Sequence, residues 1–191
     1  MRSFRNLAIA AAGVGVLTLP AVFPDGPPPG RTGGFGEPTC QVCHADANVV
    51  VGAEGLWIES LPRNYMPGET YRLTVSLTRQ GMGRGGFQVS ARYAEGKVAG
   101  KQAGDLVPQD STTFVSILTN RAVQYLSHTL RGARLTAPDT STWTFMWRAP
   151  VDPPKGRAGE VIFNVAANAS NNDQSEFGDK ILIREFRVKR N

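Results

Sequence analysis

The stretch Tyr71-Arg72-Leu73-Thr74-Val75-Ser76-Leu77 carries the pattern that decides the fold, because its apolar residues alternate with polar ones. A period of two is typical of a β-strand that buries one face and exposes the other. The same alternation recurs in residues 87–93, 143–147 and 161–167. No part of the chain after residue 55 shows a helical period of comparable length. The sequence therefore predicts an all-β protein.

Four further segments are shorter strand candidates, namely residues 56–59, 113–118, 122–129 and 181–188. About eight strands separated by turns rich in Gly, Pro, Asn and Asp favour an antiparallel β-sandwich. A chain of 191 residues with 41% hydrophobic and 19% charged residues suits one globular domain and differs from coiled coils and disordered chains. A domain of this size buries roughly 70% of its unfolded surface, so two packed sheets need no disulfide.

The N-terminal region differs from the strand-rich remainder. Arg2 and Arg5 precede residues 7–23, an uncharged run of seventeen residues, and this arrangement predicts an export signal over residues 1–22. Because seventeen residues are close to the shortest helix that crosses a bilayer, an uncleaved membrane anchor is the alternative. Residues 23–38 are rich in Pro and Gly and predict a linker, so the folded domain is expected over residues 39–191.

Cys40 and Cys43 are the two cysteines of the chain, and His44, one of its two histidines, follows them directly. This C-x-x-C-H pattern provides two thiols that can add to the vinyl groups of haem and an imidazole that can bind the iron. It therefore predicts one covalently attached haem c, and export agrees with this because haem c is attached outside the cytoplasm. A redox-active cysteine pair, a structural disulfide and a zinc site are the alternatives.

A second axial ligand for the iron has to come from elsewhere in the chain. His128 is the other histidine, and strand alternation groups it with Leu126. Methionine thioethers also bind haem iron, and Met82, which lies between two glycines, is the best placed of them. The other candidates are Met66 and Met146, and an open sixth position is a further alternative.

The segment of residues 171–179 is the one polar and acidic cluster of the chain that has ligand types for a hard cation. Its polar members are Asn171, Asn172, Asp173, Glu176 and Asp179. The spacing of a calcium-binding EF-hand is absent, because the glycine falls at the wrong position and no glutamate closes the loop. A turn in which Asn and Asp side chains bond to their own backbone is the favoured interpretation.

Six segments occur in an order that resembles a known family. They are GGFGEPTCQVCH (33–44), YMPGETYRLTVSL (65–77), GMGRGGFQVSAR (81–92), VQYLSHT (123–129), STWTFMWRAP (141–150) and VIFNVAANASNNDQSEFGDKI (161–181). Together they resemble the Reeler domain family, in the bacterial branch that has a C-x-x-C-H segment before the sandwich. The resemblance implies an immunoglobulin-like β-sandwich with an N-terminal haem-binding loop. The chain lacks the additional cysteines of eukaryotic Reeler domains, so no disulfide is implied.

The resemblance also assigns roles to individual residues. Cys40 and Cys43 correspond to the two haem thioethers, and His44 corresponds to the axial ligand beside them. His128 falls at the histidine of the family's His-Thr element, which implies that it is the second axial ligand.

These observations predict an exported monohaem c-type cytochrome that acts as an electron carrier and not as an enzyme. Its expected partners are redox proteins in the periplasm or at the membrane, with membrane attachment through residues 7–23 as an option. The alternatives are a secreted immunoglobulin-like binding or adhesion module with structural haem, and a haem-based sensor with an open sixth site. Nucleic acid is not an expected partner, because the net charge of +5 is spread along the chain.

Overall fold

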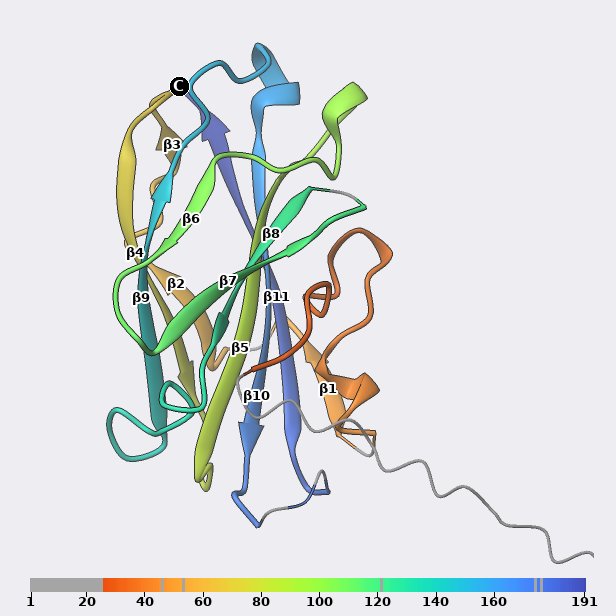
Figure 1. Ribbon diagram of the computed structural model, residues 1–191, viewed down its shortest axis with the longest axis vertical. Coiled ribbons are helices and arrows are strands. Elements are labelled where there is room, and N and C mark those ends of the chain that lie inside the picture. Colours follow the sequence, from red (N-terminus) through yellow and green to blue (C-terminus); the bar gives the residue numbers. More distant parts are fainter. Residues whose placement is uncertain (1–25, 46, 53, 121, 174, 176) are drawn as a thin grey trace, which may run out of the picture.

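The described residues form two β-sheets that pack face to face (Figure 1). The computed structural model describes residues 26–45, 47–52, 54–120, 122–173, 175 and 177–191. The larger sheet has the order β1 (Asn48–Val51), β11 (Lys180–Arg190), β10 (Val161–Ser170), β5 (Arg84–Tyr93), β8 (Val123–His128) and β7 (Thr113–Leu118), with β3 (Asn64–Tyr65) beside β11. The smaller sheet has the order β2 (Leu56–Glu59), β4 (Thr70–Thr78), β9 (Thr140–Arg148) and β6 (Asp105–Pro108).

The helical elements of the described residues are short 3₁₀ turns. They are η1 (Gly34–Gly36), η2 (Cys40–Val42), η3 (Gly96–Val98) and η4 (Gly156–Gly159). Within these residues, no helix is both long and apolar enough to cross a membrane. The predicted export signal or membrane anchor lies outside the described residues.

The core lies between the two sheets and follows the alternation read from the sequence. In β4 the side chains of Leu73, Val75 and Leu77 are fully buried, and the residues between them are half-buried. β9 repeats this pattern with two core tryptophans, whose indole nitrogens donate to backbone carbonyls: Trp143 to Gly132 (2.7 Å) and Trp147 to Ala103 (3.0 Å). The apolar surface is thus removed from water without an unpaired indole N–H, which stabilises the sandwich.

The all-β prediction is confirmed, and each of the eight predicted strands is present. Three further short strands, β1, β3 and β6, were not predicted. β1 and β3 both pair with β11 in parallel, so the larger sheet is antiparallel except at this edge. β1 and β6 have four residues each and β3 has two, and none of them shows the alternating burial seen in the four residues of β2.

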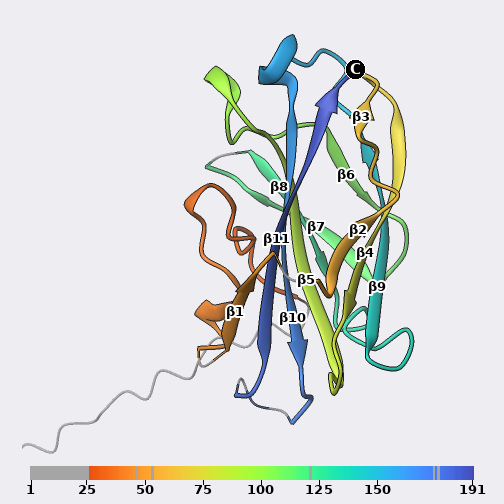
Figure 2. The ribbon, with the colours of Figure 1, turned by 180° about the vertical axis from the view of Figure 1, so that it is seen from behind.

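The central strands β5 and β10 are buried on both faces, which is unusual for a sheet of a two-layer sandwich. Their inner faces pack in the core. Their outer faces carry polar residues, such as Gln88, Ser90 and Arg92 on β5, and these are buried too. Figures 1 and 2 both show the segment from residue 26 to residue 45 beside this sheet, on the side away from β2, β4 and β9. The N-terminal segment is therefore a partial third layer.

Candidate functional site

The segment that carries the C-x-x-C-H motif lies against the outer face of β5 and β10. The side chain of Gln88 accepts a hydrogen bond from the backbone N–H of Arg31 (2.6 Å) and donates one to the carbonyl of Pro28 (3.0 Å). Gly34 approaches β10 so closely that a Cβ atom there would be 2.2 Å from Asn164. A glycine is required at this contact, because a larger residue would push the segment off the sheet.

A buried ion pair holds the same segment. Arg92 on β5 donates to both carboxylate oxygens of Glu37, at 2.7 and 2.9 Å, and the two side chains are 1% and 5% exposed. Thr32 donates to Glu37 at 2.8 Å, and the hydroxyl of Tyr125 on β8 donates to it as well. A bidentate contact between an arginine and a carboxylate that also accepts from other donors is among the strongest polar contacts in proteins. The segment, rich in Gly and Pro, is thus positioned by contacts within the polypeptide.

The motif itself forms a single helical turn. Thr39 caps the turn, because its hydroxyl accepts from the backbone N–H of Gln41 (3.2 Å). The carbonyl of Cys40 then accepts from the N–H groups of Cys43 (3.2 Å) and His44 (3.1 Å). The turn therefore ties the backbones of Cys43 and His44 to the carbonyl of Cys40, so all three residues of the motif belong to one compact segment.

The two cysteines are free thiols and have different environments. Burial raises the pKa of Cys40 to about 12, so its thiol is protonated at neutral pH. Cys43 is exposed. Neither sulfur atom is used in a disulfide bond. Cys43 is open to a reactant from solvent, whereas a reactant has access to the sulfur of Cys40 only when that thiol becomes exposed.

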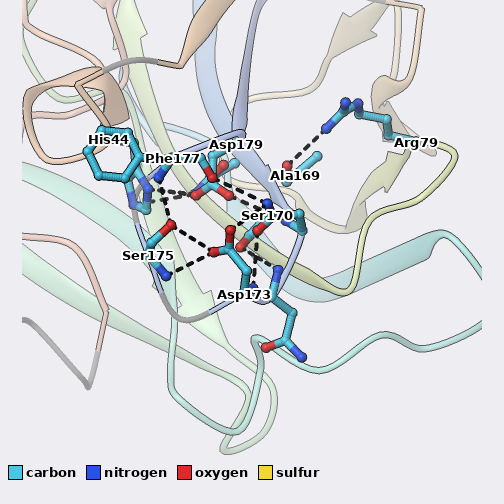
Figure 3. A network of polar contacts seen from close by, with 11 residues as sticks. His44, Arg79, Ala169, Ser170, Asp173, Ser175, Phe177 and Asp179 are labelled. Carbon is cyan, nitrogen blue, oxygen red and sulfur yellow. Dashed lines mark hydrogen bonds and ion pairs between the residues drawn. The ribbon is translucent and has the colours of Figure 1, made fainter.

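His44 points from this turn towards the loop between β10 and β11, where it meets Asp179 (Figure 3). Its Nδ1 lies 2.7 Å from Oδ2 of Asp179, whose side chain is fully buried, while the imidazole is 32% exposed. Asn168 on β10 donates to the same oxygen at 2.8 Å, and the backbone N–H of Asn171 donates to Oδ1 at 3.3 Å. Because the carboxylate accepts, Nδ1 of His44 is the donor in this contact, and in the neutral tautomer that fits it the lone pair is on Nε2.

The amide of Asn168 does not block that lone pair. Its nitrogen is 3.2 Å from Nδ1 and 3.3 Å from Nε2 of His44. An atom in line with the lone pair of either ring nitrogen would be much farther from the other nitrogen. The amide nitrogen therefore lies over the imidazole ring, and not in line with the lone pair of Nε2.

His128 lies at the end of the ladder between β5 and β8. Its Nδ1 is 2.9 Å from the backbone nitrogen of Phe87 and 3.1 Å from the carbonyl oxygen of Phe87. The ring lies over Gly86, where a Cβ atom would be 2.7 Å from Cε1 of the imidazole. Burial lowers the pKa of His128, against the effect of the Phe87 backbone bond, and the charge of His44 lowers this pKa further. The two histidines therefore interact electrostatically.

The expectation that His128 follows Leu126 is wrong. Leu126 is fully buried in the core, whereas the imidazole of His128 lies over Gly86, on the outer side of the sheet. Strand pairing explains the difference, because the ladder between β5 and β8 ends at the pair Gln88 and Ser127. Beyond that pair β5 and β8 are no longer paired, and the imidazole of His128 takes a hydrogen-bonding position next to the backbone of Phe87.

The register of the sheet brings the two histidines onto one face. Gly86, beneath His128, is paired across the ladder with Asn168, which contacts His44. The row His128, Gly86, Asn168 and His44 therefore crosses β8, β5 and β10 and ends at the motif. This juxtaposition of residues far apart in the chain is the central feature of the site.

The three methionines proposed as alternative ligands lie elsewhere. Met82 is buried in the core between the two sheets. Met146 is on β9 between the core residues Phe145 and Trp147, so it faces away from the core on the smaller sheet. Met66 is 46% exposed, and its sulfur accepts from Asn191. None of them shares the outer face of the larger sheet with His44.

The described residues of the polar segment 171–179 form turns that are held by side-chain hydrogen bonds. Asp173 accepts from the backbone and hydroxyl of Ser175, both at 2.9 Å, and Asn171 donates to Asp173 (2.9 Å). The described part of the chain contains no group of three or more His, Cys, Asp or Glu residues that could hold a metal ion. The segment nevertheless contributes Asp179 to His44. No local sequence signal could have revealed this contact, because it depends on the pairing of distant strands.

The β-sandwich of this chain is similar to several solved structures. The fold is similar to that of Reeler domains. A reeler domain fragment of human F-spondin has a TM-score of 0.47 at 21% identity and covers 76% of this chain and 96% of its own. The Reelin-N domain of F-spondin has a TM-score of 0.48 at 21% identity, with 79% and 96% covered. A cohesin module from Clostridium perfringens has a TM-score of 0.45 at 12% identity, with 72% and 96% covered. No family model and no curated protein matches the sequence.

Proposed function

We propose that the protein is an exported monohaem c-type cytochrome that carries single electrons between redox partners. The proposal rests on the C-x-x-C-H turn, which lies on the same sheet face as the second histidine of the chain. In this proposal Cys40 and Cys43 bind the haem covalently, and His44 and His128 bind the iron. Bound haem would supply an iron centre that alternates between the ferric and ferrous states.

The residues present fit such a group in three respects. The two thiols are free, and they share one helical turn with His44. Nδ1 of His44 is bonded to a buried carboxylate, which is the common arrangement for a histidine that binds a metal through Nε2. Nδ1 of His128 lies within hydrogen-bonding distance of both an N–H and a carbonyl of Phe87, so either tautomer of its ring has a partner.

Two imidazole ligands suit electron transfer better than catalysis. A six-coordinate iron has no vacancy for oxygen, peroxide or carbon monoxide, and its ligands need not change when the iron is oxidised or reduced. Imidazole stabilises ferric haem more than a thioether does, so the reduction potential is expected below that of cytochromes with histidine and methionine ligands. The partners are proposed to be redox proteins in the periplasm or at the membrane.

The experiment that tests the proposal is an absorption spectrum of the protein made with a c-type maturation system. We expect a pyridine haemochrome spectrum of one haem c per chain, and a low-spin spectrum in both oxidation states. A protein that matures without haem would contradict the proposal and favour a binding or adhesion module. Fractionation of the producing cells should place the haem protein outside the cytoplasm.

Replacing His128 with alanine is expected to open the sixth coordination position. The reduced variant should bind carbon monoxide, which the reduced wild type should not, because alanine has no donor atom. Carbon monoxide titration followed by absorption spectroscopy measures this change. Met66→Leu is the control, because it removes an exposed thioether that follows β3 at the C-terminal end of β11, whereas His44 contacts Asp179 at the opposite end of that strand. A His128→Ala variant that stays low-spin and does not bind carbon monoxide would exclude His128 as the ligand.

A further inference from the structure

We infer that Asp179 is a positioning residue for the iron ligand His44, and that its buried carboxylate lowers the reduction potential of the centre. The inference rests on the proposed function and adds a residue that neither the motif nor the family resemblance identifies. Asp179 fixes the orientation of the imidazole and increases the electron density at Nε2, which stabilises the ferric state.

The geometry around Asp179 supports a role in orientation. Its Oδ2 is 2.7 Å from Nδ1 of His44, and its side chain is completely buried. The amide of Asn168 donates to Oδ2 of this carboxylate, and the backbone N–H of Asn171 donates to Oδ1, so both of its oxygens are held. A carboxylate held from two directions cannot follow the imidazole if the ring turns, so it fixes the plane of the ring.

The environment also supports an electrostatic role. A buried carboxylate acts through a lower effective dielectric constant than an exposed one, so its charge is felt strongly at the imidazole. Asn168 donates to the same oxygen that accepts from His44, and this second bond reduces the electron density that Oδ2 offers to Nδ1. Asp179 and Asn168 should therefore influence His44 in opposite directions.

Three substitutions test this on the mature haem protein. Asp179→Asn removes the charge but keeps nearly the same shape, and we expect its reduction potential to rise. Asn168→Ala removes the competing donor, and we expect its potential to fall. Asp173→Asn is the matched control, because Asp173 is an exposed carboxylate in the same loop that bonds to Asn171 and Ser175. Its potential should equal that of the wild type.

The measurements are haem content from the pyridine haemochrome spectrum, the potential from a spectroelectrochemical titration, and the ferric electron paramagnetic resonance spectrum. The g-values should change for Asp179→Asn and not for Asp173→Asn. Wild-type protein without haem would contradict the proposed function. Wild-type protein with haem, together with variants that retain wild-type potentials, would contradict only the role of Asp179. If Asp179→Asn does not accumulate, the direction of the shift in Asn168→Ala decides, and a rise in that potential overturns the inference.

Discussion

Replacing both Cys40 and Cys43 with alanine should remove all covalently bound haem from the protein. Each thioether requires one thiol, and Cys40 and Cys43 are the two cysteines of the sequence. The measurement is haem staining after denaturing electrophoresis, where wild-type protein should stain and the double variant should not. The single variants Cys40→Ala and Cys43→Ala should each retain at most one thioether and stain weakly.

The double variant should still fold, which separates attachment from folding. Neither cysteine belongs to the core cluster between the sheets, and Cys43 is exposed. Circular dichroism should therefore show a β-rich spectrum close to that of the wild type. A double variant that still stains on the gel would show that haem is attached at another residue, and the assignment of the thioethers would be wrong.

Replacing Glu37 with alanine should lower the free energy of unfolding by about 3–5 kcal/mol, because it leaves Arg92 as a buried charge without its partner. Arg92 is 1% exposed, so it cannot recover water as a partner without moving. The variant should also release the segment that carries the motif, and cleavage before residue 45 should become faster. Urea unfolding and limited proteolysis measure the two effects.

The exposed pair of Glu95 and Arg157 provides the control. Its atoms are 2.9 Å apart, but the side chains are 38% and 84% exposed, so Glu95→Ala should change stability little. The double variant Glu37→Ala/Arg92→Met should regain part of the stability lost in Glu37→Ala, because it also removes the unpaired charge. A Glu37→Ala variant as stable as Glu95→Ala would contradict the importance of the buried pair.

The strands could be predicted because alternation is a local signal. In the strands that cover one core face, such as β4 and β9, each second side chain is buried, and the sequence shows this directly. The outer faces of β5 and β10 were harder to interpret. Arg92 and Gln88 look like solvent-facing residues, and their burial depends on a segment that contacts them from more than fifty positions away in the chain.

The candidate site could be predicted only where its residues are close in sequence. The spacing of Cys40, Cys43 and His44 is a local signal with a specific chemical meaning. The contacts of His44 with Asp179 and of His128 with Gly86 depend on strand order and register, which one sequence does not show. The position of His128 was also misjudged, because the rule of alternation fails where a ladder ends.

The N-terminal layer has a consequence for the order of events during folding. Its partners Gln88, Arg92, Tyr125 and Asn164 belong to three different strands, so the surface that receives it exists only after β5, β8 and β10 have paired. Contacts between such distant residues form late, because closing long loops costs chain entropy. Before the segment packs, the thiol of Cys40 is free of the burial that raises its pKa. We therefore expect thioether formation to precede the final packing of the segment, with a maturing chain most reactive while its sheets are formed and its N-terminal layer is still open.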